Sequence, residues 1–170
     1  MLTNIQEIKS KTLLFIGVFI FIFLFRYIPH PPNFTPVIAL TAYVSIFFGI
    51  RSSIFVIAAF AVSDIFIGLH NLLFFTWGAL ALVSFAGRFA TQFYSRILFL
   101  LISSLIFFMV SNFGVWLLSD FYNKDLNGMF ACYLLAIPFF TNTLISTLLF
   151  GLLFELIILG KTKIILSNYK

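Results

Sequence analysis

Charged residues are scarce in this chain of 170 residues, at 9% of the sequence, with ten Lys and Arg against five Asp and Glu. A water-soluble domain carries about 25% charged residues, because water must solvate its surface. Cysteine is almost missing too, and the single Cys132 excludes a disulfide framework. Apolar residues make up 62% of the chain, which excludes a disordered protein. The composition therefore predicts an all-α integral membrane protein, with residues 1–170 forming a single transmembrane domain.

Long apolar runs predict a compact bundle of about six membrane-spanning helices. A spanning helix needs about 20 residues, so a chain of this length holds about five or six of them with their connections. The predicted spans cover residues 12–28, 35–50, 53–70, 72–87, 97–118 and 138–160.

The basic residues predict the orientation of this bundle. With the N-terminus in the cytoplasm, eight of the ten Lys and Arg lie on the cytoplasmic side, and only Arg26 and Lys124 lie outside. Both termini are then cytoplasmic, in a multi-pass protein of the cell's inner (plasma) membrane. The basic residues are scattered singly, so no nucleic-acid partner is expected. Pro29 and Arg26 follow the first apolar run where a signal peptide would have a small-residue cleavage site, so this helix is predicted to stay uncleaved.

Proline is confined to two places, and both interrupt helices. Four of the five prolines lie within residues 29–36, which predicts an irregular, kinked segment on the outer side. Pro36 is expected in the first turn of the second span, with Thr35 or Asn33 as its cap. Pro138 divides the long apolar stretch near the C-terminus into a short outer helix and the last span, because the whole stretch exceeds one membrane crossing.

The uncommon polar residues gather at one depth, toward the outer side. Asp64 is the one acid well inside an apolar run, where a carboxylate costs about 3 kcal/mol, so it needs a partner: either an ion pair with Arg26 or a direct ligand contact. Near the inner end, Glu155 is expected to pair with Lys161 or to reach the interface. The residues predicted to bind a ligand are His30, Asn33, Asp64, Asn112, Trp116, Tyr133 and Asn142.

Such a cluster predicts an outward-opening pocket for a small polar or amphipathic molecule. The motifs of zinc peptidases, serine hydrolases and phosphate-binding loops are missing, so we expect no enzyme activity. The two histidines and the cysteine lack the spacing of a metal or haem site, so we expect no metal and no cofactor. The apolar inner half excludes an ion channel, which needs polar residues through its full depth.

Several motifs carry a resemblance to a known family. They are Pro29 to Pro36 (PHPPNFTP), Ser63-Asp64 with Gly68 and His70, residues 111–116 (SNFGVW), and Cys132-Tyr133 with residues 137–143 (IPFFTNT). Together they resemble a family of small uncharacterised bacterial membrane proteins that is similar to the substrate-binding S components of energy-coupling factor (ECF) transporters.

This resemblance implies a six-helix bundle that captures a vitamin or similar micronutrient from outside. A separate transmembrane coupling subunit with two ATPases would then drive the release of the ligand. S components commonly carry small residues on the first helix for docking to that subunit, whereas residues 12–25 contain only Gly17. Two alternatives stay open: an accessory subunit of a larger respiratory or photosynthetic membrane complex, and a membrane enzyme that acts on a lipid or quinone through His30 and Asp64.

Overall fold

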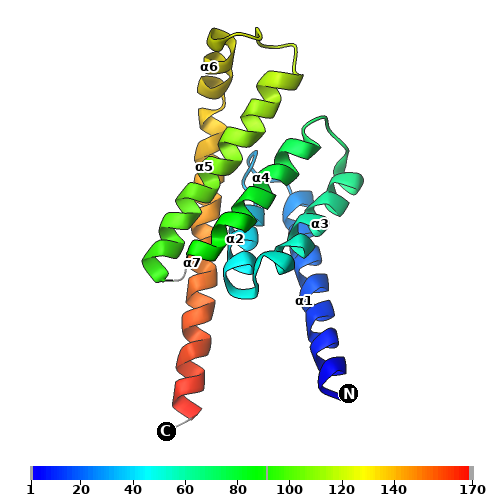
Figure 1. Ribbon diagram of the computed structural model, residues 1–170, viewed down its shortest axis with the longest axis vertical. Coiled ribbons are helices and arrows are strands. Elements are labelled where there is room, and N and C mark those ends of the chain that lie inside the picture. The colour runs from blue at the N-terminus through cyan, green and yellow to red at the C-terminus, as the bar shows by residue number, and fades with distance from the viewer. Residues whose placement is uncertain (1, 91, 169–170) are drawn as a thin grey trace.

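Helices make up almost all of the chain in the computed structural model, which describes residues 2–90 and 92–168. Within these residues there are seven α-helices, one short 3-10 helix and no strand (Figure 1). The elements are α1 (Leu2–Tyr27), α2 (Val37–Phe48), α3 (Ile50–Ile67), α4 (Leu73–Ala86), η1 (Gly87–Phe89), α5 (Phe93–Leu118), α6 (Leu126–Leu135) and α7 (Ile137–Asn168).

Three of these helices are long and apolar enough to cross a membrane. They are α3, α5 and the Ile137–Gly160 part of α7. The apolar parts of the other helices are shorter, between 10 and 17 residues. The prediction of an all-helical protein is therefore confirmed for the described residues, and three of its helices could cross a membrane by length and composition.

The exterior is apolar and the interior is rich in small hydroxyl groups. Large apolar side chains such as Leu105 and Leu149 are half exposed. Inside, Thr41 and Ser103 are fully buried, and each donates its proton to the carbonyl one turn earlier in its own helix. Small residues let helices approach closely where lipid covers the outside, so this distribution is that of a membrane protein.

The short helix α2 lies near the middle of the bundle (Figure 1). Eight of its twelve residues are buried, and it packs against α3, α4, α5 and α7. At 1.5 Å per residue it is only about 18 Å long, shorter than the α1, α3, α5 and α7 helices around it. Space is therefore left beyond its N-terminus, among the ends of its neighbours.

The predicted helices are all present, with differences at their ends. The six expected spans correspond to α1, α2, α3, α4, α5 and α7, and the short helix before Pro138 corresponds to α6. Helix α1 begins at Leu2, ten residues before the apolar run, because Gln, Glu and Lys also favour helix. The expected cap of α2 is wrong: Pro36 is its N-cap residue, and no side chain from Thr35 or Asn33 caps the helix.

The two ends of the molecule differ in what they contain. The described N- and C-terminal ends of the chain lie together at one end, which we call the proximal end (Figure 1). The connections over residues 28–36, 68–72 and 119–125 lie toward the opposite, distal end. Lys170 lies outside the described residues.

Candidate ligand-binding site

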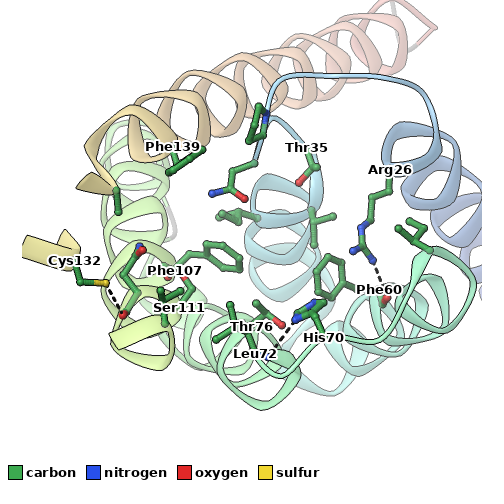
Figure 2. A pocket seen from close by; sticks show the side chains of 18 of the residues that line it. Arg26, Thr35, Phe60, His70, Leu72, Thr76, Phe107, Ser111, Cys132 and Phe139 are labelled. Atoms are coloured by element: carbon green, nitrogen blue, oxygen red, sulfur yellow. Dashed lines mark hydrogen bonds between the residues drawn. The ribbon is translucent and has the colours of Figure 1, made fainter. Parts of the chain in front are cut away.

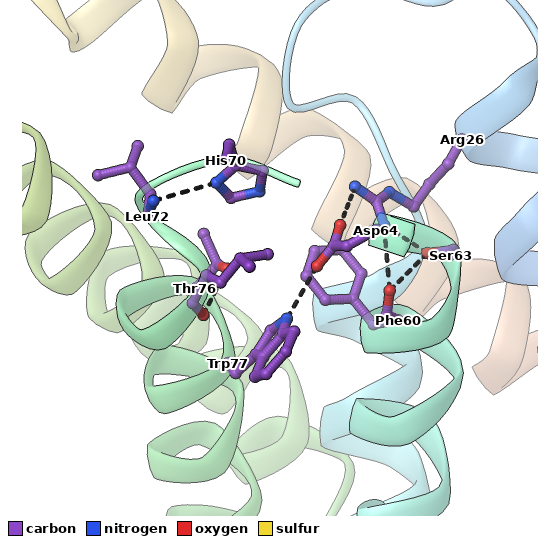
Figure 3. A network of polar contacts seen from close by, with 9 residues as sticks. Arg26, Phe60, Ser63, Asp64, His70, Leu72, Thr76 and Trp77 are labelled. Atoms are coloured by element: carbon purple, nitrogen blue, oxygen red, sulfur yellow. Dashed lines mark hydrogen bonds and ion pairs between the residues drawn. The ribbon is translucent and has the colours of Figure 1, made fainter. Parts of the chain in front are cut away.

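Arg26 and Asp64 form an ion pair between α1 and α3. The Arg26 Nη2 atom lies 2.6 Å from Asp64 Oδ1, as the shared depth of the two residues led us to expect. The Nη1 atom donates to the Phe60 carbonyl at 3.2 Å and to the Ser63 hydroxyl. The guanidinium carbon also lies 4.2 Å from the centre of the Phe60 ring (Figure 3). Helix α3 therefore fixes the position of the Arg26 side chain.

The Asp64 carboxylate is enclosed behind Arg26. Its exposed fraction is 0%, and its Oδ2 atom accepts a hydrogen bond from Trp77 Nε1 at 2.8 Å. The Oδ1 atom has only the charge contact with Arg26, without a hydrogen bond of favourable angles. The sequence prediction allowed Asp64 to contact a ligand directly, but Asp64 is not among the residues that line the cavity beside Arg26. We therefore assign it to positioning Arg26 (Figure 3).

A cavity of about 600 Å³ lies beside this pair at the distal end of the bundle. This volume is within the usual range of small-molecule sites. Its polar residues come from α1, α4, α5, α6 and three connections, and its other walls are apolar and aromatic (Figure 2). The lining includes Arg26, His30, Asn33, Thr35, Val37, Ile38, Phe60, His70, Leu72, Thr76, Phe107, Ser111, Asn112, Cys132, Ala136 and Phe139.

The proline-rich segment forms a fixed turn at the mouth of this cavity. Asn33 has a φ of 63°, a left-handed conformation that asparagine tolerates better than most residues. The Phe34 N–H donates to the Pro31 carbonyl at 3.0 Å. The His30 Nδ1 atom lies 2.6 Å from the Ile28 carbonyl, which can only accept, so this nitrogen carries the ring proton. The turn places both His30 and Asn33 on the cavity wall.

Helices α4 and α5 supply the polar groups on the other walls. The hydroxyls of Thr76 and Ser111 donate to carbonyls of their own helices at 3.0 and 2.7 Å. Asn112 Nδ2 donates in the same way at 2.8 Å. In the connection before α4, the Leu72 N–H donates to His70 Nδ1 at 3.2 Å. These contacts leave oxygen lone pairs on three side chains free to accept from a ligand.

A family model described as a family of unknown function (DUF6580) matches residues 6–165. The chain belongs to this family. No curated protein and no solved structure matches it. The matched range contains α2 to α6 in full, the distal cavity and the residues of the ion pair, so the DUF6580 unit is the helical bundle itself.

Besides Asp64, three residues predicted to bind a ligand lie outside the lining of the DUF6580 cavity. Trp116 Nε1 donates at 2.9 Å to a carbonyl in the connection between α5 and α6. The Tyr133 hydroxyl donates at 2.7 Å to a carbonyl of α5. Asn142 Nδ2 donates at 3.1 Å to the Pro32 carbonyl in the proline-rich segment. Each of these side chains joins two segments of the bundle, so the structure gives them a role in packing.

The predicted site list also missed residues that line the cavity. His70, Thr76 and Ser111 contribute polar groups, and Phe107 and Phe139 contribute aromatic walls. Ser111 lies at the depth of Asn112, so the depth argument alone would have included it. The phenylalanines carried no signal, because the chain has 26 of them and most face elsewhere. Among the described residues, no group of three or more His, Cys, Asp or Glu side chains could hold a metal.

A second ion pair lies at the proximal end of the DUF6580 bundle, on α5 and α7. Arg96 Nε and Nη2 contact the two carboxylate oxygens of Glu155 at 2.5 and 2.8 Å. The Tyr43 hydroxyl of α2 donates to Glu155 Oε1 at 2.7 Å. The expectation that Glu155 reaches the interface is wrong, because its exposed fraction is 2%. The Lys161 side chain lies outside what the structure describes.

Proposed function

We propose that this DUF6580 protein is a membrane-embedded binding protein for a small molecule, and that the distal cavity is its site. The observation that carries the proposal is the cavity of about 600 Å³, in which a partly buried, fixed arginine and several amide, imidazole and hydroxyl groups converge between aromatic walls. A concave, mostly apolar site with a few well-placed polar groups is the usual form of a small-molecule site.

We further propose six membrane spans, formed by α1, α2, α3, α4, α5 and α7. An even number of crossings puts both chain ends on one side, which agrees with their position at the same end in Figure 1. The excess of Lys and Arg in the proximal segments supports a cytoplasmic location of this end in the bacterial inner membrane. The cavity then opens toward the outside of the cell, where a binding protein for uptake would meet its ligand.

The resemblance to S components supports a role in import. In this proposal the DUF6580 bundle captures a vitamin or similar micronutrient, and a coupling subunit with ATPases drives the release of the ligand into the cell. No catalytic step is proposed for the cavity residues.

The test is mass spectrometry of small molecules that co-purify with the protein in mild detergent. Asn112→Leu keeps the side-chain volume and removes the amide oxygen from the cavity wall. We expect the wild-type protein to carry a small molecule that this variant loses. The matched control is Ser103→Ala, which removes a buried hydroxyl of the same helix away from the cavity and should retain the molecule.

Two outcomes would contradict the proposal. One is that no small molecule is retained by either protein, and the other is that Asn112→Leu retains as much as the wild type. Native mass measurement of the same preparation identifies the partners. ATPase partners support import, whereas a large stoichiometric partner without ATPases would favour an accessory subunit of a membrane complex.

A further inference from the structure

We infer that the cavity is polarised, and that its ligand is a small organic carboxylate with neutral N–H or O–H donors at the opposite end. This inference rests on the proposed function, because it names the chemical class of the ligand for the same site. It follows from the hydrogen-bonding atoms that five of the lining residues, Arg26, His70, Thr76, Ser111 and Asn112, have already used.

One side of the cavity offers positive charge and N–H donors. Arg26 is the only Lys, Arg, Asp or Glu among the lining residues that the structure describes. Its counter-ion Asp64 has no exposed surface, so a ligand meets the guanidinium and not the carboxylate. The His70 Nδ1 atom accepts from a backbone N–H, so the ring proton is on Nε2, which is then a donor. This side therefore suits an anionic group.

The N-terminus of the central helix α2 adds positive potential to the cavity. Val37 and Ile38, the first two residues of α2, line the cavity, and no side chain caps this helix. The first N–H groups of a helix lack partners within it, and they form the positive end of the helix dipole. The cavity floor thus has the same preference for an anion as Arg26.

The other side of the cavity offers acceptors. On this side the Ser111 hydroxyl has given its only proton to a helix carbonyl; the Thr76 hydroxyl has done the same, but lies beside His70 in Figure 2. Asn112 has given an amide N–H to the carbonyl one turn earlier, which leaves its oxygen free. These oxygens accept from ligand donors. A ligand ammonium would find no carboxylate in this lining, so neutral donors fit better.

The two sides are separated by aromatic rings. In the view of Figure 2, Arg26 and Ser111 lie on opposite sides of the cavity, with Phe107 and Phe60 between them. A ligand that reaches both sides must therefore have an apolar or aromatic middle. The structure thus defines three parts of the ligand: an anion, an apolar centre and a neutral donor.

Four probes of nearly equal shape test each part separately: 4-aminobenzoate, 4-aminobenzamide, 4-methylbenzoate and 4-methylbenzamide. Their binding to the full chain in detergent is measured in two ways at millimolar concentration. The first is the shift of the thermal unfolding midpoint. The second is the protection of Cys132, the single cysteine, which lines the cavity, from a small thiol reagent.

We expect 4-aminobenzoate to bind most tightly. Replacing its carboxylate by the amide should weaken binding roughly tenfold, and replacing its amine by methyl should weaken it by about fivefold. The double variant Arg26→Gln/Asp64→Asn should lose the preference for the acid and keep the preference for the amine. Asn112→Leu should show the reverse pattern.

Equal binding of the acid and the amide, or no binding of any probe in either measurement, would overturn the inference. These results are distinct from the failure of the proposed function. If a neutral molecule co-purifies and is lost from Asn112→Leu, the cavity is a binding site but its polarity is misassigned. If nothing co-purifies with the wild type, the proposed function itself fails.

Discussion

The two ends of the bundle each contain a buried carboxylate paired with an arginine, but the surroundings of the two pairs differ. At the proximal end, Arg96 contacts both oxygens of Glu155, and Tyr43 adds a third contact. At the distal end, Arg26 gives Asp64 a single contact and borders a cavity. The proximal pair joins three helices, whereas the distal pair holds a cation in place beside open space.

This difference separates the structural role of the proximal pair from the binding role that we propose for the distal pair. A buried carboxylate with bidentate and phenolic partners has little capacity left for a ligand. Arg26 divides its contacts between Asp64, Ser63 and the Phe60 carbonyl, all on α3, and its cavity side remains available. The burial of a charge is therefore weak evidence for a site, and a cavity on the open side of that charge is the informative observation.

The largest effect on stability is expected from Glu155→Gln at the proximal end. It removes the charge that Arg96 contacts in a membrane-spanning segment, and breaking a buried pair of this kind costs about 3–5 kcal/mol. Equilibrium unfolding in mixed micelles measures this free energy. The control is the exposed acid in Asp120→Asn, which should change stability by less than about 0.5 kcal/mol. Equal values for the two variants would contradict the structural role.

Asp64→Asn is expected to lower the free energy of unfolding less than Glu155→Gln does, and to weaken ligand binding more. Arg26 keeps its contacts with Ser63 and the Phe60 carbonyl, so the loss of folding free energy should be about 1–3 kcal/mol. Binding should weaken because the guanidinium loses the Asp64 contact, one of the α3 contacts that fix its position beside the cavity. Isothermal titration with 4-aminobenzoate measures the second effect. If Asp64→Asn is as destabilised as Glu155→Gln and binds the probe as well as the wild type does, the distal pair has a structural role like that of the proximal pair.

Trp77→Phe should have a smaller effect at the distal end. It removes the indole N–H that donates to Asp64 Oδ2 at 2.8 Å and keeps an aromatic ring in its place. A hydrogen bond to a charged group is worth about 1.5–3 kcal/mol, and we expect a cost near the lower limit because the Arg26 contact remains. Thermal unfolding in detergent measures the change. Loss of the folded protein would show that Trp77 does more than support Asp64.

The smallest effect concerns the reactivity of Cys132, whose sulfur lies in α6 at the edge of the cavity. Burial raises the pKa of this thiol, so at neutral pH little thiolate is present. Alkylation should be slow near pH 7 and should accelerate as the pH rises toward the pKa. Asn71→Cys in a Cys132→Ser background provides an exposed control, which should react faster. Equal rates at pH 7 would contradict the burial of the thiol.

The helices could be predicted from the sequence, because apolar length and proline position determine them locally. Pro138 marked the start of α7 to within one residue, and Pro36 marked the start of α2. The partner of Asp64 could also be predicted, since Arg26 was the only cation at its depth. The extension of α1 to Leu2 could not, because polar residues continue a helix without any apolar signal.

Only some of the residues that line the cavity could be predicted from the sequence. The predicted depth of each residue in the membrane placed His30, Asn33 and Asn112 in the same group, and all three line the cavity. Depth does not say which side of a helix faces inward, and these helices are apolar all round, so their sequences give no polar face. Trp116 and Tyr133 lie at the right depth, yet their polar atoms bond to neighbouring main-chain carbonyls.

The most direct test of the central claim is native mass spectrometry of the wild-type protein and the Arg26→Gln/Asp64→Asn double variant, released from the same detergent. The double variant removes both charges with little change in volume, so the bundle should remain folded with its cavity. We predict that the wild type retains one small molecule per chain and that the double variant has lost it. Equal occupancy in the two proteins would contradict a binding site built on Arg26.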